Sequence, residues 1–295
     1  MSERASHSFS FGRVTTLASN TLTELTRLKV FYVLLLFALV LIGSSAVIAR
    51  LSFQQEFQVL KDISLGAMSI FTSLLAIVAT ARMLPQDLED RTIYTILAKP
   101  VHRSEYLLGR LGGVLLLLAI STLVMSLLFC VVLYTREHSA LSEAARQMSA
   151  QPADQQQETF QAIRAASFNP DLVPGIAVIY IKAALLASLT LFISTFATTN
   201  IFTIAVTVSV YFIGHLQGTA REFWLQEHGG SWLSRAFLAT VALIFPDLQL
   251  FNLADDVVAG ATIPLAVFLK TAVFGGFYTL LYLLLAIAIF SGKEL

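Results

Sequence analysis

Long apolar runs separated by polar segments dominate the chain, and six of them approach or exceed the length of a membrane span. They cover residues 30–49, 63–81, 111–134, 176–197, 201–216 and 263–290. A transmembrane helix needs about 20 predominantly apolar residues. The pattern therefore predicts an all-α integral membrane protein with six transmembrane helices. The last run is long enough to require tilt, or a kink near Gly275–Gly276.

Composition supports this class. Of the 295 residues, 56% are hydrophobic and 13% are charged, whereas about 25% of the residues of an average soluble domain are charged. No polar block is long enough to form a separate soluble enzyme. The formal net charge of zero argues against nucleic acid as a partner, and the single cysteine, Cys130, excludes a disulfide framework and a cysteine-based zinc site.

Residues 1–29 precede the first apolar run and are predicted to form a tail and an interfacial helix. From residue 13 onward the apolar positions share one helical face, with basic residues nearby. Residues 1–12 fit a polar tail equally well. No small-residue cleavage site follows the first apolar run, so a secretory signal is not predicted.

Two longer polar segments separate later spans. Residues 135–175 are rich in Gln, Ala and Ser, and they predict two short helices broken near Gln151–Pro152, with Asp154 capping the second. This segment is either a solvated connector or a docking surface for an external partner. Residues 217–262 contain an apolar run, 236–245, that is too short to span, so we expect a re-entrant or surface helix there. A seventh full span is the competing interpretation.

Orientation follows from the distribution of Lys and Arg near the ends of the spans. More of these residues lie in the amino-terminal tail, the segment 82–110 and the carboxyl terminus than in the three segments on the other side. Both termini are therefore predicted to be cytoplasmic. A seventh span would instead place the carboxyl terminus outside.

The segment 82–110, RMLPQDLEDRTIYTILAKPVHRSEYLLGR, is a short connection between two spans with an unusual density of charge. It carries five basic and four acidic residues, and each charge costs about 2.5–3.5 kcal/mol at the bilayer centre. The segment must therefore lie in water or at the headgroups. Its apolar residues recur at roughly helical spacing, which predicts short amphipathic helices on the membrane surface. Such helices suit contact with a soluble partner.

The order of residues within this segment is distinctive. An acidic pair is followed by Arg91–Thr92, then Ile96–Leu97, Lys99–Pro100, Arg103 and finally Leu107–Leu108–Gly109–Arg110. This order resembles the first cytoplasmic loop of type-2 ATP-binding-cassette permeases, closest to the branch of multicopper-enzyme or nitrous-oxide-reductase maturation permeases. The carboxyl terminus, residues 290–295, is similar to the short charged tails of that family.

The resemblance implies a non-catalytic permease subunit of a bacterial inner-membrane exporter. A separate ATPase subunit would bind ATP and Mg, and this chain would hold no cofactor. A second permease chain would complete a homodimer or heterodimer. The residues implied in ATPase coupling are Asp87, Glu89, Asp90, Arg91, Thr92, Lys99, Pro100 and Arg103. The acidic residues among them would pair with basic residues of the ATPase or cap the loop's own helices, and both alternatives stay open.

A search for other chemistry returns few candidates. The chain has no G-x-x-x-x-G-K-[ST] phosphate-binding loop, and its five histidines show no metal-ligand spacing. Neither a catalytic residue nor a metal site is predicted. Ionisable residues within spans are functional candidates, namely Lys182, His215 and Lys270. The two lysines either line a substrate pathway or snorkel to the interface, and His215 is either interfacial or part of the same pathway.

Two further function classes remain open from the sequence. The chain could be an ATPase-driven membrane anchor or mechanotransmitting subunit that acts on an external partner without moving cargo, with 135–175 as the contact. It could instead be an intramembrane enzyme that uses His215 or Lys182, although the spans lack a cluster of polar residues.

Overall fold

The computed structural model describes residues 10–50, 55–89, 102–148, 152–227, 232, 245–258 and 260–292. Within these ranges the regular elements are all helices, and six helices are long and apolar enough to cross a membrane. Helices are expected there because hydrocarbon offers backbone groups no hydrogen-bond partners, so the chain must satisfy them internally. The predicted all-α, six-helix membrane protein is confirmed.

The six long helices are α2 (Lys29–Ala49), α3 (Glu56–Ala81), α6 (Arg103–Gln147), α8 (Leu172–Ser194), α9 (Asn200–Glu227) and α12 (Leu265–Gly292). The shorter elements are α1 (Phe11–Thr26), α4 (Met83–Glu89), α7 (Ala153–Ser167), the 3-10 helix η1 (Leu248–Phe251) and α11 (Ala254–Val258).

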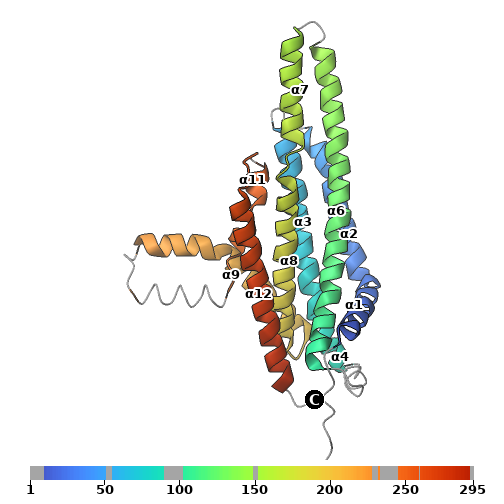
Figure 1. Ribbon diagram of the computed structural model, residues 1–295, viewed down its shortest axis with the longest axis vertical. Helices are drawn as coiled ribbons and strands as arrows, with labels where there is room; N and C mark the ends of the chain where they lie inside the picture. Colours follow the sequence, from blue (N-terminus) through green and yellow to red (C-terminus); the bar gives the residue numbers. More distant parts are fainter. Residues whose placement is uncertain are drawn as a thin grey trace, which may run out of the picture.

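Long helices of the bundle lie side by side, as Figure 1 shows for α3, α6, α8 and α12. We call the end of the bundle that holds α4 and the last turn of α12 the α4 end, and the opposite end the α7 end. At the α7 end, α6 and α7 form an antiparallel pair that projects beyond the other helices. At the other end of α6, α1 packs against its first turns.

The helix α6 differs most from the predicted span. It begins at Arg103 rather than at residue 111, and it ends at Gln147 rather than at 134. Hydropathy marks only the part of a helix that faces hydrocarbon, whereas backbone hydrogen bonding continues through polar residues on both sides. The end of the segment 82–110 and the start of 135–175 therefore belong to one continuous helix.

The segment 135–175 breaks where the sequence indicates, because α7 starts at Ala153 just after Pro152. The first of the two predicted short helices is the end of α6 rather than a separate element. Asp154 does not cap α7, since Pro152 holds the N-cap position. Asp154 lies instead in the first turn, where a carboxylate interacts favourably with the helix dipole.

The helices α8 and α3 form the centre of the bundle. Most side chains of α8 from Val178 onward are buried, and this helix packs against α3, α6, α9 and α12. By contrast, α2 exposes large apolar side chains such as Tyr32, Val33 and Leu36 on its outer face. Exposed apolar surface of this kind is what a lipid-facing helix presents.

The region 217–262 is described only in part. The helix α9 continues past the predicted end of its span to Glu227, and η1 and α11 precede α12. Most of the apolar run 236–245, for which we predict a re-entrant or surface helix, lies outside the described residues. The helix α12 is continuous through Gly275–Gly276 and is inclined to α6 in Figure 1.

Candidate functional site

A buried ion cluster joins three helices at the α4 end. Nη2 of Arg110 in α6 donates to both carboxylate oxygens of Asp87 in α4, and Nη1 donates to Oε2 of Glu24 in α1 at 2.5 Å. The hydroxyl of Tyr106, one turn before Arg110, also donates to Asp87. Arg110, Asp87 and Tyr106 are all buried. We call these four residues the Arg110 cluster.

The chemistry of the Arg110 cluster is that of a structural clamp. A guanidinium carries five N–H donors in one plane. Here Nη2 reaches both oxygens of Asp87, and Nη1 reaches a carboxylate on a different helix. A buried charge is tolerated when it is paired and hydrogen-bonded. The cluster therefore fixes the position of α4 relative to α1 and α6.

A second buried carboxylate, Glu105, joins the starts of α1 and α6. It accepts hydrogen bonds from the backbone N–H of Ser10 at 2.7 Å, from Nη2 of Arg13 at 2.8 Å and from the backbone N–H of His102 at 3.2 Å. Glu105 lies before the apolar part of α6. Burial tends to raise its pKa, but these donors outweigh burial and hold the pKa of Glu105 below its usual range. The group is therefore ionised at neutral pH.

Two glycines allow α1 to approach α6 closely. A Cβ on Gly113 would lie 2.5 Å from Cβ of Thr21 and 2.8 Å from the carbonyl oxygen of Ala18. A Cβ on Gly109, four residues earlier and so on the same face, would lie 2.5 Å from Cβ of Leu17. Small residues at this spacing are a common means of close helix packing in membranes. We call this close contact between α1 and α6 at Gly109 and Gly113 the seam. It brings Glu24 within reach of Arg110.

The last turn of α12 is held at the same end. Nη1 of Arg103 donates to the carbonyl oxygens of Phe290 at 3.0 Å and Ser291 at 2.9 Å. These carbonyls belong to the last turn of the helix, which has no intrahelical donors and carries partial negative charge. The ring of Phe290 also stacks on Tyr106, with centroids 5.9 Å apart. Motion of α4 would thus reach α1, α6 and α12 together.

The structure places only some of the predicted ATPase-coupling residues. The carboxylate of Asp87 is engaged by Arg110 inside this chain, a contact that neither of the two alternatives named. Arg103 is bound to α12. Asp90, Arg91, Thr92, Lys99, Pro100 and the side chain of Glu89 lie outside the described residues. Sequence reasoning missed the Arg110 cluster and the separate Glu105 contacts, although the spacing of Tyr106, Gly109, Arg110 and Gly113 on one helix was available as a signal.

The predicted pathway residues separate into two groups. Lys182 and His215 lie near each other, because Nζ of Lys182 is 6.0 Å from the ring centroid of Tyr211 and the rings of Tyr211 and His215 are 4.3 Å apart. Lys182 is buried between helices, and its Nζ donates to Oγ of Ser69 in α3. Lys270 is exposed on α12 and does not belong to this group.

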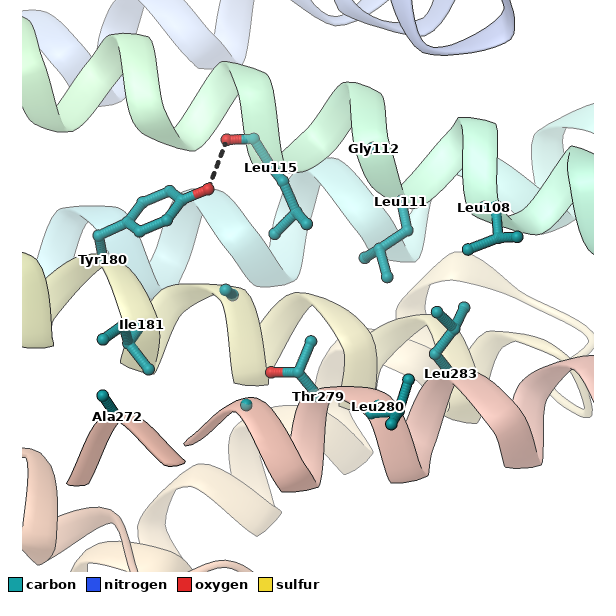
Figure 2. A pocket seen from close by; sticks show the side chains of 12 residues that line it. Leu108, Leu111, Gly112, Leu115, Tyr180, Ile181, Ala272, Thr279, Leu280 and Leu283 are labelled. Atoms are coloured by element: carbon teal, nitrogen blue, oxygen red, sulfur yellow. Dashed lines mark hydrogen bonds between the residues drawn. The ribbon is translucent and has the colours of Figure 1, made fainter. Parts of the chain in front are cut away.

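An apolar pocket of about 490 Å³ lies between α6, α8 and α12. Figure 2 shows Leu108 and Leu111 of α6 facing Leu283 of α12, and the hydroxyl of Tyr180 donating to the carbonyl oxygen of Leu115 at 3.4 Å. A second pocket of about 380 Å³ continues between α6 and α8 on the other side of Tyr180. Neither lining includes a charged side chain, so both pockets suit hydrocarbon rather than ionic ligands.

The search for a metal centre gives no candidate. In the part of the chain that the structure describes, no three His, Cys, Asp or Glu side chains are grouped so that they could hold a metal ion. The chain matches no protein-family model and no curated protein. The fold and the six long apolar helices define its class, a multi-pass all-α membrane protein.

Proposed function

We propose that the chain is the transmembrane permease subunit of an ATP-binding-cassette transporter of the exporter type. A separate ATPase subunit binds ATP and Mg, and this chain is the non-catalytic part that converts nucleotide-driven motion into substrate movement. The order of residues in 82–110, which resembles the coupling loop of type-2 permeases, is the first support.

The observation that carries the proposal is the attachment of this segment to the bundle. Its amino-terminal part, α4, is clamped to α6 through Asp87 and Arg110, and the cluster extends to α1 through Glu24. A force applied to the segment by a soluble partner passes directly into α6. If α4 were not attached to α6, the same force would move the segment 82–110 without moving the helices of the bundle.

The proposal sets the orientation. The α4 end faces the cytoplasm, where the ATPase and the ATP are, and both termini lie on that side of the bacterial inner membrane. The excess of Lys and Arg at this end agrees with the positive-inside rule. A second permease chain, identical or homologous, completes the pathway.

A second candidate function is supported by the length of α6. Its 45 residues give a helix about 67 Å long at 1.5 Å per residue, roughly twice the thickness of the hydrocarbon core. At the α7 end, Nζ of Lys61 donates to the carbonyl oxygen of Ala166 at 2.7 Å, and Arg136 pairs with Glu56 at 2.8 Å. Motion at the Arg110 cluster would therefore move α6 and α7, which fits a mechanotransmitting subunit acting on an external partner.

Affinity purification from native membranes in mild detergent tests the proposal. Mass spectrometry of the eluate should identify a nucleotide-binding subunit, and the eluate should hydrolyse ATP. Recovery of this chain alone from a complex-preserving detergent would contradict it. Substrate flux in liposomes that hold the complex separates the two candidates, since the mechanotransmitting subunit would give ATP hydrolysis and cross-links from α7 to an external protein without flux.

A further inference from the structure

Lys182 is a buried cation within the predicted span 176–197. It is the eleventh residue of α8, which runs from Leu172 to Ser194, and it is 3% exposed. Its Nζ donates to Oγ of Ser69, which lies near the middle of α3. Both positions are about 15 Å or more from the ends of their helices at 1.5 Å per residue. The stem of Lys182 is directed into the bundle toward Ser69 and away from its surface.

The cation has no carboxylate partner among the described residues. The ion pairs there are Arg13–Glu105, Arg110–Glu24, Arg110–Asp87 and Arg136–Glu56, and none includes Lys182. A lysine at the centre of a membrane helix costs about 2.5–3.5 kcal/mol, and such residues are usually paired or functional. A role in packing alone would be served more cheaply by an apolar side chain.

Several side chains near Lys182 can donate hydrogen bonds. Ser69 has a hydroxyl, the hydroxyl of Tyr211 is bonded to Ser73, and His215 places Nδ1 3.0 Å from the carbonyl oxygen of Tyr211. Lys182 and Asp247 both act electrostatically on His215. Ser69, Tyr211 and His215 are only partly buried. The buried ammonium thus lies beside side chains that are themselves partly exposed.

The helix α9 supports this arrangement with a row of polar residues. Thr203, Thr207, Tyr211 and His215 recur every four residues and so share one face. Thr203 and Thr207 are fully buried, and α9 packs against both α3 and α8. The interface that covers Lys182 is therefore polar along several turns. A ligand with its own polar groups can replace these contacts.

We propose that Lys182, Ser69 and Tyr211, with His215 beside them, form an intramembrane binding site for an oxyanion of the transported substrate, either a carboxylate or a phosphate. This inference rests on the proposed permease function and names its substrate class. An oxyanion accepts hydrogen bonds from Lys182, Ser69 and Tyr211 and neutralises the buried charge of Lys182. A cationic substrate would be repelled by Lys182, and an apolar one would leave the donors without partners.

Ligand-induced thermal stabilisation of the purified full-length chain in dodecyl maltoside tests the site, because a ligand that binds the folded state raises its melting temperature. The probes are decyl phosphate, decanoate, decanol, decyltrimethylammonium and inorganic phosphate. We expect the two anionic amphiphiles to stabilise the wild type, whereas decanol and decyltrimethylammonium do not. Stabilisation by inorganic phosphate would indicate that the site binds a water-soluble anion. Stabilisation by decyl phosphate without stabilisation by inorganic phosphate would indicate that it binds an anionic amphiphile.

The variants give the decisive comparison. Lys182→Met should weaken apparent affinity for decyl phosphate by at least about tenfold, the loss of roughly 1.4 kcal/mol, whereas Lys270→Met, at the exposed lysine of α12, should bind as the wild type does. Ser69→Ala and Tyr211→Phe keep the charge of Lys182, so each should weaken the binding of decyl phosphate less than Lys182→Met does. These two variants provide the test if Lys182→Met does not fold. Equal stabilisation by decanol, or unchanged decyl phosphate binding in these variants, would overturn the site. The assay contains no ATPase, so its failure is distinguishable from failure of the permease proposal.

Discussion

Arg110 binds both oxygens of the Asp87 carboxylate, although the two residues belong to different helices and are 23 positions apart in the chain. The same guanidinium reaches Glu24 of α1. One side chain thus connects the amino-terminal helix, α4 and the longest helix of the bundle. In the proposed permease this contact is the point at which motion of the segment 82–110 enters the membrane domain.

Loss of the Asp87 carboxylate should destabilise the chain. Asp87→Asn leaves Arg110 buried with only Glu24 as its anionic partner in the described part, and removing one member of a buried pair costs about 3–5 kcal/mol. We expect the free energy of unfolding to fall by about 3 kcal/mol. This is the lower end of the range, because Glu24 is partly exposed and remains paired with Arg110. Thermal unfolding in detergent measures it. Asp154→Asn, in the exposed first turn of α7, is the matched control, and equal melting temperatures for the two variants would contradict the clamp.

The seam between α1 and α6 makes a second prediction. Gly113→Ala would place a methyl group against Thr21 and the backbone of Ala18, and such overpacking costs about 1–3 kcal/mol. We expect α1 to become more accessible to protease and the melting temperature to fall. Gly276→Ala in α12 is the control, since nothing lies within 4 Å of its Cβ position and alanine is the better helix former. Similar behaviour of the two variants would refute close packing at Gly113.

The sequence predicted the class and the helix count because both depend on local properties. Unbroken apolar runs of about 20 residues such as 30–49 favour helices in hydrocarbon, and Pro152 marks the break before α7. The sequence did not predict the ends of α6, since polar residues on both sides of the apolar run continue the same backbone hydrogen bonding. The predicted span 111–134 lies within a helix that extends beyond it at both ends.

The candidate sites depend on contacts between distant parts of the chain. Lys182 has Ser69 as its partner, 113 positions away, and no local pattern distinguishes such a lysine from one that snorkels. Glu24 and Arg110 are 86 positions apart. The charges themselves were visible in the sequence, but the pairs they form depend on which helices pack together.

Lowering the pH should release α1 from α6 only at pH values below the usual pKa range of a carboxyl group. The pKa of Glu105 is lower in the folded state than the value of about 4.3 for a free glutamate. The contribution of Glu105 to the free energy of unfolding is therefore complete above about pH 4.3. It is lost as the pH falls through the lower pKa of the folded state. A spin label at Ser19→Cys on exposed α1, in a Cys130→Ser background, should stay immobile from pH 8 to about pH 4.5. In Glu105→Gln it should be mobile throughout, and equal mobility in both backgrounds would contradict this role.

Arg103 should hold the end of α12 in place. Its guanidinium bonds to the carbonyls of Phe290 and Ser291, and a hydrogen bond to a charged group contributes about 1.5–3 kcal/mol. Arg103→Gln should therefore speed amide hydrogen exchange in the last two turns of α12. Lys270→Gln, near the other end of the same helix, should leave that exchange unchanged. Unaltered exchange in Arg103→Gln would show that the contact does not restrain the helix.

The central claim is that the segment 82–110 meets an ATPase on the cytoplasmic side. Site-specific photo-cross-linking in intact cells tests it most directly, with p-benzoylphenylalanine at Thr92 in the segment and, for comparison, at Asp154 in α7. We predict that the Thr92 position cross-links to a nucleotide-binding subunit and that the Asp154 position does not. Absence of that product from Thr92, or its appearance only from Asp154, would contradict the assigned orientation and the coupling role.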